Sequence, residues 1–226
     1  MDDIRDRIVA AAADLLATGG RDAVTTRAVG AAAGVQAPTI YRHFGDMRGL
    51  LDAVAEHGFA THLSGKGWHV ASTDPVENLR AGWDLHVEFG LSNPDLYALM
   101  YGNPRPAASA AAAKARSILS AHVRAIAAAG RLRVAEDYAV HVIHATGSGT
   151  VFALLEQPED ERDLVAAAIT RDAALAAITT DAPAVAAPGP AAAANALRAV
   201  LGEAEALSAG ERALLDEWLG RLVRAG

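Results

Sequence analysis

Apolar residues recur along this chain every three to four positions, the spacing that places them on one face of an α-helix. No segment shows the strict alternation of apolar and polar residues that is typical of a strand. The pattern therefore predicts an all-α protein. Helices are expected at about residues 3–17, 46–62, 107–129, 135–156, 158–180 and 191–204.

Further helices are predicted from residues that favour a helix N-terminus. Asp or Ser caps the first free amides, Pro fits the first turn, and Glu at the third position completes the cap. Such starts occur at Asp74-Pro75-Val76-Glu77, at Asn93-Pro94 and at Ser208 with Glu211. Breaks are expected at Gly19-Gly20 and in the proline-rich segment 182–190, which reads as a stiff linker.

Residues 25–51 predict two short helices joined by a tight turn. Gly34 suits the turn, and Pro38 suits the first turn of the second helix because its φ is already helical. Ile40 and Phe44 lie four residues apart, so both side chains can point into the same core. The rest of the second helix offers the polar surface with which a helix-turn-helix enters a major groove. That surface consists of Gln36, Ala37, Thr39, Tyr41, Arg42 and His43.

This segment resembles the DNA-binding domain of the TetR (tetracycline-repressor/AcrR) family of bacterial transcription regulators, over roughly residues 4–62. The resemblance rests on Thr25-Thr26-Arg27, Gly34-Val35, Thr39 through Phe44, and Asp46 through Leu51. It implies an N-terminal three-helix helix-turn-helix domain joined to a larger helical ligand-binding and dimerisation domain. The expected limits are 1–62 for the DNA-binding domain, 63–180 for the second domain and 181–226 for a linker and C-terminal helical extension.

The resemblance also implies which residues contact double-stranded operator DNA. Thr26 and Arg27 match positions that bind phosphates or base edges at the margin of the groove. Tyr41 and His43 match phosphate-contacting positions, and Arg42 matches one that reaches base edges, where a guanidinium can pair with guanine. The start of the recognition helix is matched by Gln36, Ala37, Pro38 and Thr39.

One position departs from the family. Where its members commonly carry a lysine that meets a phosphate, this chain has Met47, which cannot make that contact. The neighbouring Arg48 is expected to bind the phosphate with altered geometry, or else one contact is missing.

The charge of the chain limits how strongly it can bind DNA. Its net charge is −7, and residues 1–62 hold six arginines against eight acidic residues. Residues 21–48 are locally basic, with four arginines against two aspartates. Helix N-termini near Thr26 and Ala37 add free amides for phosphates. We therefore expect modest non-specific affinity and a salt dependence equivalent to a few phosphates per subunit.

The predicted second domain is rich in alanine, and a small group of larger side chains stands out within it. These side chains are candidates to line an apolar cavity with a few polar anchors for a small-molecule effector. The candidates are Trp83, His86, Phe89, Tyr97, Met100, Tyr101, His141, His144 and Phe152. The alternative is that each belongs to the ordinary core, as aromatic side chains at helical spacing usually do. Neither a metal site nor a cofactor is expected, because the histidines lack a recognisable acidic ligand motif.

Two further features concern assembly. The helices at 135–156 and 160–180 have small, alanine-rich faces and resemble the family's pair that forms a four-helix bundle with a second copy, which implies a homodimer. The C-terminal extension carries an apolar face that is expected to bury on its own domain or across the dimer. That face consists of Leu214, Leu215, Trp218, Leu219 and Leu222.

Composition narrows the possible functions. Without cysteine the chain has no disulfide and no thiol nucleophile, and the charged N-terminus and broken apolar runs favour a cytoplasmic protein without a membrane partner. No G-x-S-x-G, HExxH or phosphate-loop motif is present, so an enzyme is not expected. The family resemblance, together with the candidate cavity lining, implies a transcriptional regulator, a repressor released by an apolar or aromatic ligand. The alternative is a ligand-independent architectural DNA-binding protein.

Overall fold

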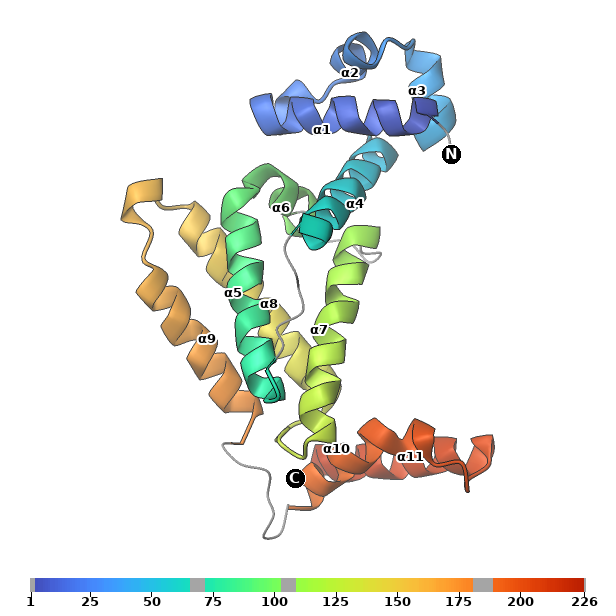
Figure 1. Ribbon diagram of the computed structural model, residues 1–226, viewed down its shortest axis with the longest axis vertical. Helices are drawn as coiled ribbons and strands as arrows, with labels where there is room; N and C mark the ends of the chain where they lie inside the picture. The colour runs from blue at the N-terminus through green and yellow to red at the C-terminus, as the bar shows by residue number, and fades with distance from the viewer. Residues whose placement is uncertain (1–2, 66–71, 103–108, 181–188, 226) are drawn as a thin grey trace. The chain divides into compact units, whose positions relative to one another are not determined.

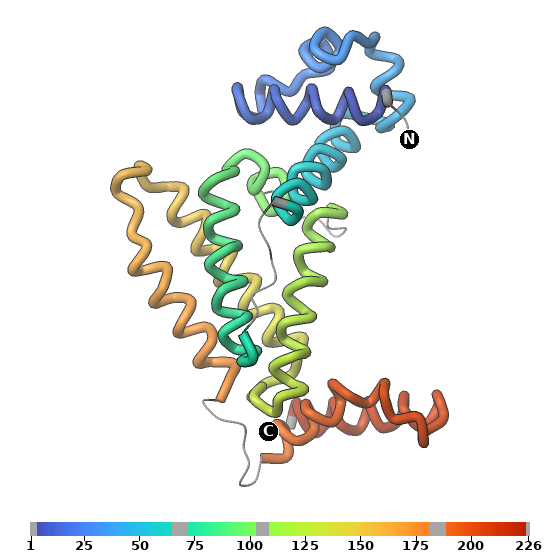
Figure 2. Tube along the Cα trace, in the orientation of Figure 1, coloured from blue at the N-terminus to red at the C-terminus, as the bar shows by residue number. Residues whose placement is uncertain are grey.

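A computed structural model describes residues 3–65, 72–102, 109–180 and 189–225 (Figure 1). These ranges are all-α, as predicted, and contain no strand; Leu132 and Thr179 form an isolated bridge. Figure 2 traces the helices α1 (Asp3–Ala23), α2 (Thr26–Ala33), α3 (Ala37–Phe44), α4 (Met47–Gly65), α5 (Pro75–Ser92), α6 (Pro94–Tyr101), α7 (Ala110–Ala128), α8 (Glu136–Leu155), α9 (Leu164–Ile178), α10 (Pro190–Val200) and α11 (Ala209–Ala225), with short 3-10 turns at Glu159–Glu161 and Leu201–Glu203.

The chain divides into two compact units. The first unit contains Met1–Trp68 and Glu88–Ala115, and the second unit contains His69–Val87 and Arg116–Gly226. The domain limits predicted at residues 62 and 180 stay predictions.

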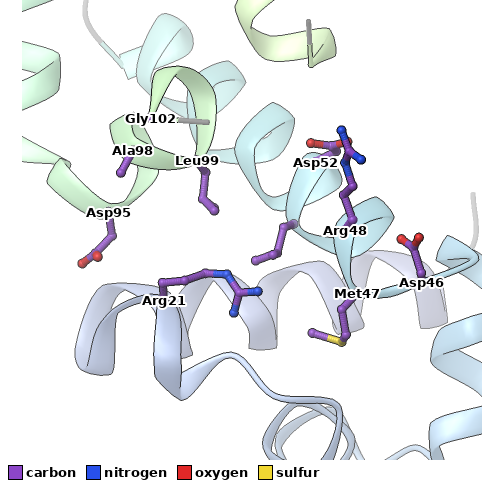
Figure 3. Close-up of a pocket in the computed structure, with 10 residues that line it drawn as sticks. Arg21, Asp46, Met47, Arg48, Asp52, Asp95, Ala98, Leu99 and Gly102 are labelled. Carbon is purple, nitrogen blue, oxygen red and sulfur yellow. The ribbon is translucent and has the colours of Figure 1, made fainter. Parts of the chain in front are cut away.

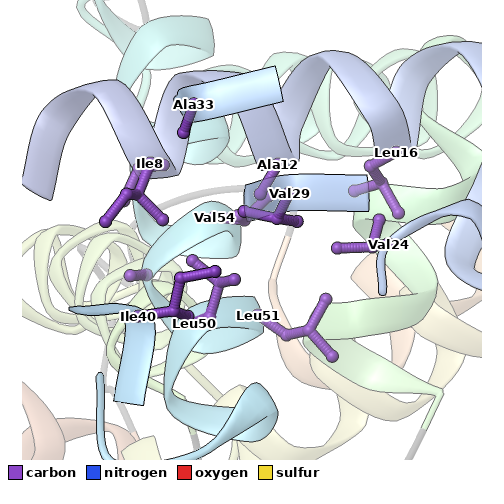
Figure 4. Close-up of a cluster of buried hydrophobic side chains, with 12 residues drawn as sticks. Ile8, Ala12, Leu16, Val24, Val29, Ala33, Ile40, Leu50, Leu51 and Val54 are labelled. Carbon is purple, nitrogen blue, oxygen red and sulfur yellow. The ribbon is translucent and has the colours of Figure 1, made fainter. Parts of the chain in front are cut away.

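The core of the first unit is built on one stripe of α1. Ile8, Ala12 and Leu16 lie four residues apart and are at most 4% exposed. Figure 4 shows this stripe facing Val24, which lies between α1 and α2, and side chains from α2, α3 and α4, which include Val29, Ala33, Ile40, Leu50, Leu51 and Val54. Because burial of one large aliphatic side chain stabilises a fold by about 1.5–3 kcal/mol, this core fixes α3 against α1 and α4.

Several predicted helix ends are confirmed. α1 is interrupted at Gly20, whose φ of +67° is a backbone conformation that glycine adopts without strain. Asp74 caps α5, since its Oδ1 accepts a hydrogen bond of 2.8 Å from the amide of Val76. Ser208 and Glu211 form the capping box of α11, with reciprocal hydrogen bonds of 2.8 and 3.3 Å.

Two predicted helices differ from the structure. The helix expected from Pro158 to about Thr180 begins only at Leu164, because Asp163 caps it by accepting hydrogen bonds from the amides of Val165 (2.9 Å) and Ala166 (3.1 Å). The prediction overlooked this aspartate as a cap. The helix expected at 191–204 ends at Val200 and continues as a 3-10 turn.

The apolar face of the C-terminal extension is only partly buried. Leu219 and Val223 pack with Ala135 and Ala194, and Leu215 joins them at the edge. Within this chain a hairpin of two helices covers one face of α11 and leaves the adjoining face open, and burial of that face across a dimer stays a prediction. The residues left open are Leu214, Trp218 and Leu222, with exposed fractions of 46%, 53% and 49%.

Among the described helices, α8 is long and apolar enough to cross a membrane by length and composition, with a mean hydropathy of 1.2. The core helix of a soluble protein meets the same criterion, so this finding carries little weight.

Candidate nucleic-acid interface and ligand region

The turn between α2 and α3 is set by local hydrogen bonds and two glycines. Thr25 caps α2, its Oγ1 accepting a hydrogen bond of 3.2 Å from the amide of Ala28. Gly34 ends α2 in the left-handed region at φ 65°. A Cβ atom on Gly30 would lie 2.9 Å from the carbonyl oxygen of Val35, so the backbone approaches too closely there for a side chain. The predicted tight turn is confirmed.

α3 presents one buried side and one exposed side, as its sequence predicts. Ile40 is fully buried, and Phe44 packs at the edge of the same core. The guanidinium carbon of Arg5 lies 5.4 Å from the centroid of the Phe44 ring, a cation–π contact that ties the end of α3 to α1. Thr39 and His43 are partly buried, whereas the exposed residues are Gln36, Ala37, Pro38, Tyr41 and Arg42.

Two residues that are predicted to bind phosphates contact each other in the structure. The hydroxyl oxygens of Thr26, at the start of α2, and Tyr41, on α3, lie 3.1 Å apart and within hydrogen-bond distance. Arg27 and Arg42 are exposed on the same two helices. A further contact, which the sequence reading missed, anchors the end of α2: Arg7 donates a hydrogen bond of 3.0 Å from Nε to the carbonyl oxygen of Ala33.

The start of α4 explains the departure at Met47. Asp46 caps the helix, its Oδ1 accepting a hydrogen bond of 2.8 Å from the amide of Gly49. Met47 is partly buried against the hydrophobic core of the first unit, while Arg48 is exposed. Met47 carries no charge. Arg48 is therefore the one of these two neighbours whose charge is available to solvent or to a phosphate.

Gly49 is a structural requirement that the sequence reading missed. A Cβ atom at this position would lie 2.1 Å from the carbonyl oxygen of Phe44, where α3 ends. We expect Gly49→Ala to move α3 away from α4 and to lower the free energy of unfolding by about 1–3 kcal/mol. Chemical denaturation measures the change. Gly210→Ala, which adds the same methyl group in open space on α11, serves as the control. Equal stability of the two variants would contradict the close approach.

A cavity of about 650 Å³ lies in the first unit beside the start of α4. In Figure 3 the Arg21 side chain reaches from the end of α1 toward Met47. Asp46 and Arg48 lie next to Met47, and Asp95 lines the cavity from α6. Two arginines and three aspartates line this cavity. Its lining contains none of the side chains predicted to bind a ligand.

The predicted ligand residues that belong to the first unit form an aromatic cluster. Phe89 and Tyr97 are 1% and 0% exposed, with ring centroids 6.2 Å apart, and Tyr101 lies 4.7 Å from Tyr97. Met100 is also buried, and burial raises the pKa of Tyr101 to about 12. The sequence reading missed two members from α4, Phe59 and His62, whose rings lie 5.6 and 4.7 Å from that of Phe89.

The predicted ligand residues of the second unit gather where α5 faces α8. A Cβ atom on Gly147 would lie 3.5 Å from the ring of His86 and 3.6 Å from that of Trp83, so this glycine allows close helix packing. Burial, with the adjacent His144, lowers the pKa of His86 to about 4. Burial, then Arg116 and His141, also lowers the pKa of His144. His141 is exposed and Phe152 partly buried.

The lowered pKa values keep His86 and His144 neutral near pH 7. A neutral imidazole offers one hydrogen-bond donor and one acceptor, which suits the anchoring of a polar group on an otherwise apolar ligand. His122, on α7 and near Gly82, was missed by the sequence reading, and burial lowers its pKa as well. Within the described ranges no three His, Cys, Asp or Glu residues come together as a metal site.

Comparison with known proteins gives a match to one segment of the first unit. Residues 8–54 match the family described as "Bacterial regulatory proteins, tetR family". The class A tetracycline repressor protein from transposon 1721 of Escherichia coli is 49% identical over 49 residues, which are 22% of this chain and 23% of that repressor. The helix-turn-helix segment of this chain thus matches the tetR family. The chain thus spans about a quarter of the length of the curated repressor that it matches.

Solved structures share the fold over more of the chain. A protein of unknown function from Rhodococcus sp. RHA1 is similar with a TM-score of 0.61 and 24% identity, over 80% of this chain and 97% of the other. A TetR variant from Acinetobacter baumannii AYE, solved in complex with minocycline, is similar with a TM-score of 0.58 and 23% identity, over 78% and 96% of the two chains. At these identities the likeness concerns the fold.

Proposed function

We propose that this tetR-family protein is a sequence-specific transcriptional regulator, a cytoplasmic homodimeric repressor that a small apolar or aromatic molecule releases from operator DNA. The observation that carries the proposal is the geometry of α3. Its buried Ile40 fixes the helix on the core, while Tyr41 and Arg42 remain exposed. A helix presented in this way fits a major groove, which is wide enough to admit it.

The roles proposed for individual side chains are those that the family resemblance implies. Arg42 reads base edges, and Gln36 through Thr39 approach the groove at the start of α3. Tyr41 and His43 bind phosphates, and Thr26 and Arg27 bind phosphates or base edges at the margin of the groove. Arg48 takes the role of the lysine that family members commonly carry where this chain has Met47, because the Arg48 side chain is exposed at the start of α4.

The homodimer is proposed to form through α8 and α9. A shallow groove of about 320 Å³ between these helices is lined largely by small side chains, among them Thr146, Gly149 and Ala166. Beside it on α9, Val165 and Ile169 are 69% and 65% exposed. Large apolar side chains so exposed next to a small-residue groove favour packing against a second copy, which closes a twofold bundle.

The effector is proposed to bind near the predicted aromatic and histidine residues. The A. baumannii neighbour is a complex with minocycline, a precedent for a small ligand on this fold. In the first unit, Phe59 and His62 of α4 contact Phe89, and Tyr97 and Tyr101 of α6 stack beside it. A ligand that displaces these aromatic rings therefore also displaces α4, and with it the α3 that packs on α4. Release then requires that the ligand bind the DNA-incompetent geometry more tightly.

Selection of genomic DNA tests the proposed function. The full-length protein is mixed with fragmented genomic DNA and excess random competitor, and bound fragments are sequenced. Enrichment of one palindromic sequence is the expected result. A folded, dimeric sample that enriches no sequence contradicts specific regulation and favours the architectural alternative.

Arg42→Ala is expected to weaken binding to the enriched sequence by about 1–3 kcal/mol and to relax base preference at one position of each half-site. The physical reason is loss of a guanidinium that can pair with a guanine edge. Fluorescence anisotropy against a panel of single-base operator variants measures both effects. Arg124→Ala removes the same charge from the second unit, where the side chain is 65% exposed, and serves as the control. Uniform weakening across the panel would instead make Arg42 a phosphate contact.

A further inference from the structure

The outer face of the C-terminal helical hairpin carries an apolar stripe. Leu214, Trp218 and Leu222 lie four residues apart on α11 and are 46%, 53% and 49% exposed. On α10, Leu197 and Val200 are 45% and 38% exposed. We call these five side chains the outer stripe. Large apolar side chains repeated along one helix face are unusual on a surface that stays in water.

The hairpin is already anchored through its other face. Leu219 and Val223 pack on Ala135 and Ala194. Asn195 donates a hydrogen bond of 2.6 Å from Nδ2 to the carbonyl oxygen of Val134. Arg198 donates one of 2.9 Å from Nε to Asp216, bridging α10 and α11. The outer stripe is therefore not needed to hold the hairpin on the second unit, and the described part of the chain leaves it open.

The charges along α11 indicate what covers the stripe. Before Trp218 the helix carries Glu211, Asp216 and Glu217 against one arginine, and after it only arginines, Arg221 and Arg224. One half of α11 is thus acidic and the other basic. A second α11 running antiparallel, with a twofold axis near Trp218, sets each acidic half against a basic half. Parallel packing would instead align like charges.

We propose that the outer stripe binds the outer stripe of a second copy of this chain, with the two α11 helices antiparallel and Trp218 at the centre. Two hairpins then form a four-helix contact in which residue pairs repeat across the twofold axis. Glu217 and Arg221 pair with each other along α11 and remain 54% and 69% exposed beside the stripe, where each can also meet the opposite charge of the other copy. A central tryptophan ringed by charge pairs is typical of a strong interface centre.

This contact differs from the proposed homodimer interface. It uses α10 and α11, whereas the homodimer uses α8 and α9. A protein that makes both contacts exceeds a dimer, unless a single twofold axis serves both faces. Variants at Trp218 and at Ile169 therefore report on the two contacts separately.

Sedimentation velocity of the full-length protein over a range of concentrations tests the proposal. Trp218→Glu places a carboxylate at the centre of the stripe and is expected to weaken hairpin association by about tenfold or more. Ala125→Glu adds the same charge at an exposed position of α7, outside the hairpin, and is expected to behave as the wild type. Circular dichroism confirms that both variants fold.

A charge reversal tests the antiparallel arrangement. Glu217→Arg sets arginine against arginine and is expected to weaken association, and Glu217→Arg/Arg221→Glu is expected to restore it. If the wild type and Trp218→Glu form the same species at every concentration, the proposal is wrong. Failure of the double reversal to restore association overturns the antiparallel pairing.

Ile169→Glu separates this proposal from the proposed homodimer. If both contacts exist, each single variant loses one step of assembly and the combined variant is a monomer. If only the hairpin contact exists, Trp218→Glu alone gives a monomer and Ile169→Glu has no effect. If only the α8 and α9 contact exists, the reverse is observed and the hairpin proposal is wrong.

Discussion

Replacing Ile40 by alanine is expected to lower the free energy of unfolding of the first unit by about 2–5 kcal/mol, the usual cost of truncating a fully buried isoleucine. Ile40 is 0% exposed and is the one residue of α3 that is fully enclosed by the core. The loss removes apolar contacts and leaves a cavity between α3 and α4. Denaturation followed by far-ultraviolet circular dichroism measures the change.

Binding to operator DNA is expected to weaken in the same variant, although Ile40 itself faces away from the groove. Exposed Tyr41 and Arg42 are positioned by the helix that Ile40 anchors. Ile4→Ala is the matched control, because Ile4 belongs to the same unit but is 37% exposed. A loss of stability below about 1 kcal/mol for Ile40→Ala, the range of the surface control, would show that α3 is held by other contacts.

Local chemistry made much of this fold predictable. Asp74, Ser208 with Glu211 and Gly34 act on amides or backbone angles within a few residues of themselves, so their effect can be inferred from neighbouring letters of the sequence. The same holds for the spacing of Ile40 and Phe44, since one helix fixes which residues share a face. Asp163 follows the same rule, since its side chain caps the amides that come directly after it, and the helix therefore begins at Leu164 and not at Pro158.

Contacts between distant residues were not predictable in this way. The hydrogen bond from Arg7 to the carbonyl of Ala33 joins positions 26 residues apart, and its donor looks like any exposed arginine in the sequence. Gly49 also gave no signal, because its neighbour is a backbone carbonyl at the end of α3, and its identity matters only after α3 and α4 meet.

The candidate ligand residues were predictable from the sequence, but their arrangement in space was not. Composition singled out Trp83, His86 and Tyr97 because large side chains are rare in an alanine-rich segment. Their separation into an aromatic cluster of the first unit and a histidine group of the second depends on how the helices pack. Phe59 and His62 escaped notice because they lie on α4, which the sequence assigned to the DNA-binding domain.

Lowering the pH from about 6.5 to about 4 is expected to cost up to about 3 kcal/mol of stability through His86 alone. Burial and the nearby His144 lower its pKa from the usual 6.5 to about 4 in the folded protein. Between these values the unfolded chain binds the proton and the folded chain does not, so the stabilisation is complete above pH 6.5 and is lost as the pH falls. The lowered pKa values of His144 and His122 act in the same direction.

His86→Gln removes the proton-binding site while keeping a polar side chain against α8. Denaturant midpoints measured at steps between pH 7.5 and pH 4, roughly the range spanned by the two pKa values, are expected to vary less in this variant than in the wild type. His57→Gln changes an exposed histidine on α4 and is expected to keep the wild-type profile. If His86→Gln instead retained the full pH dependence, the acid sensitivity would belong to other groups, and His86 would not be the neutral anchor that the proposed effector site uses.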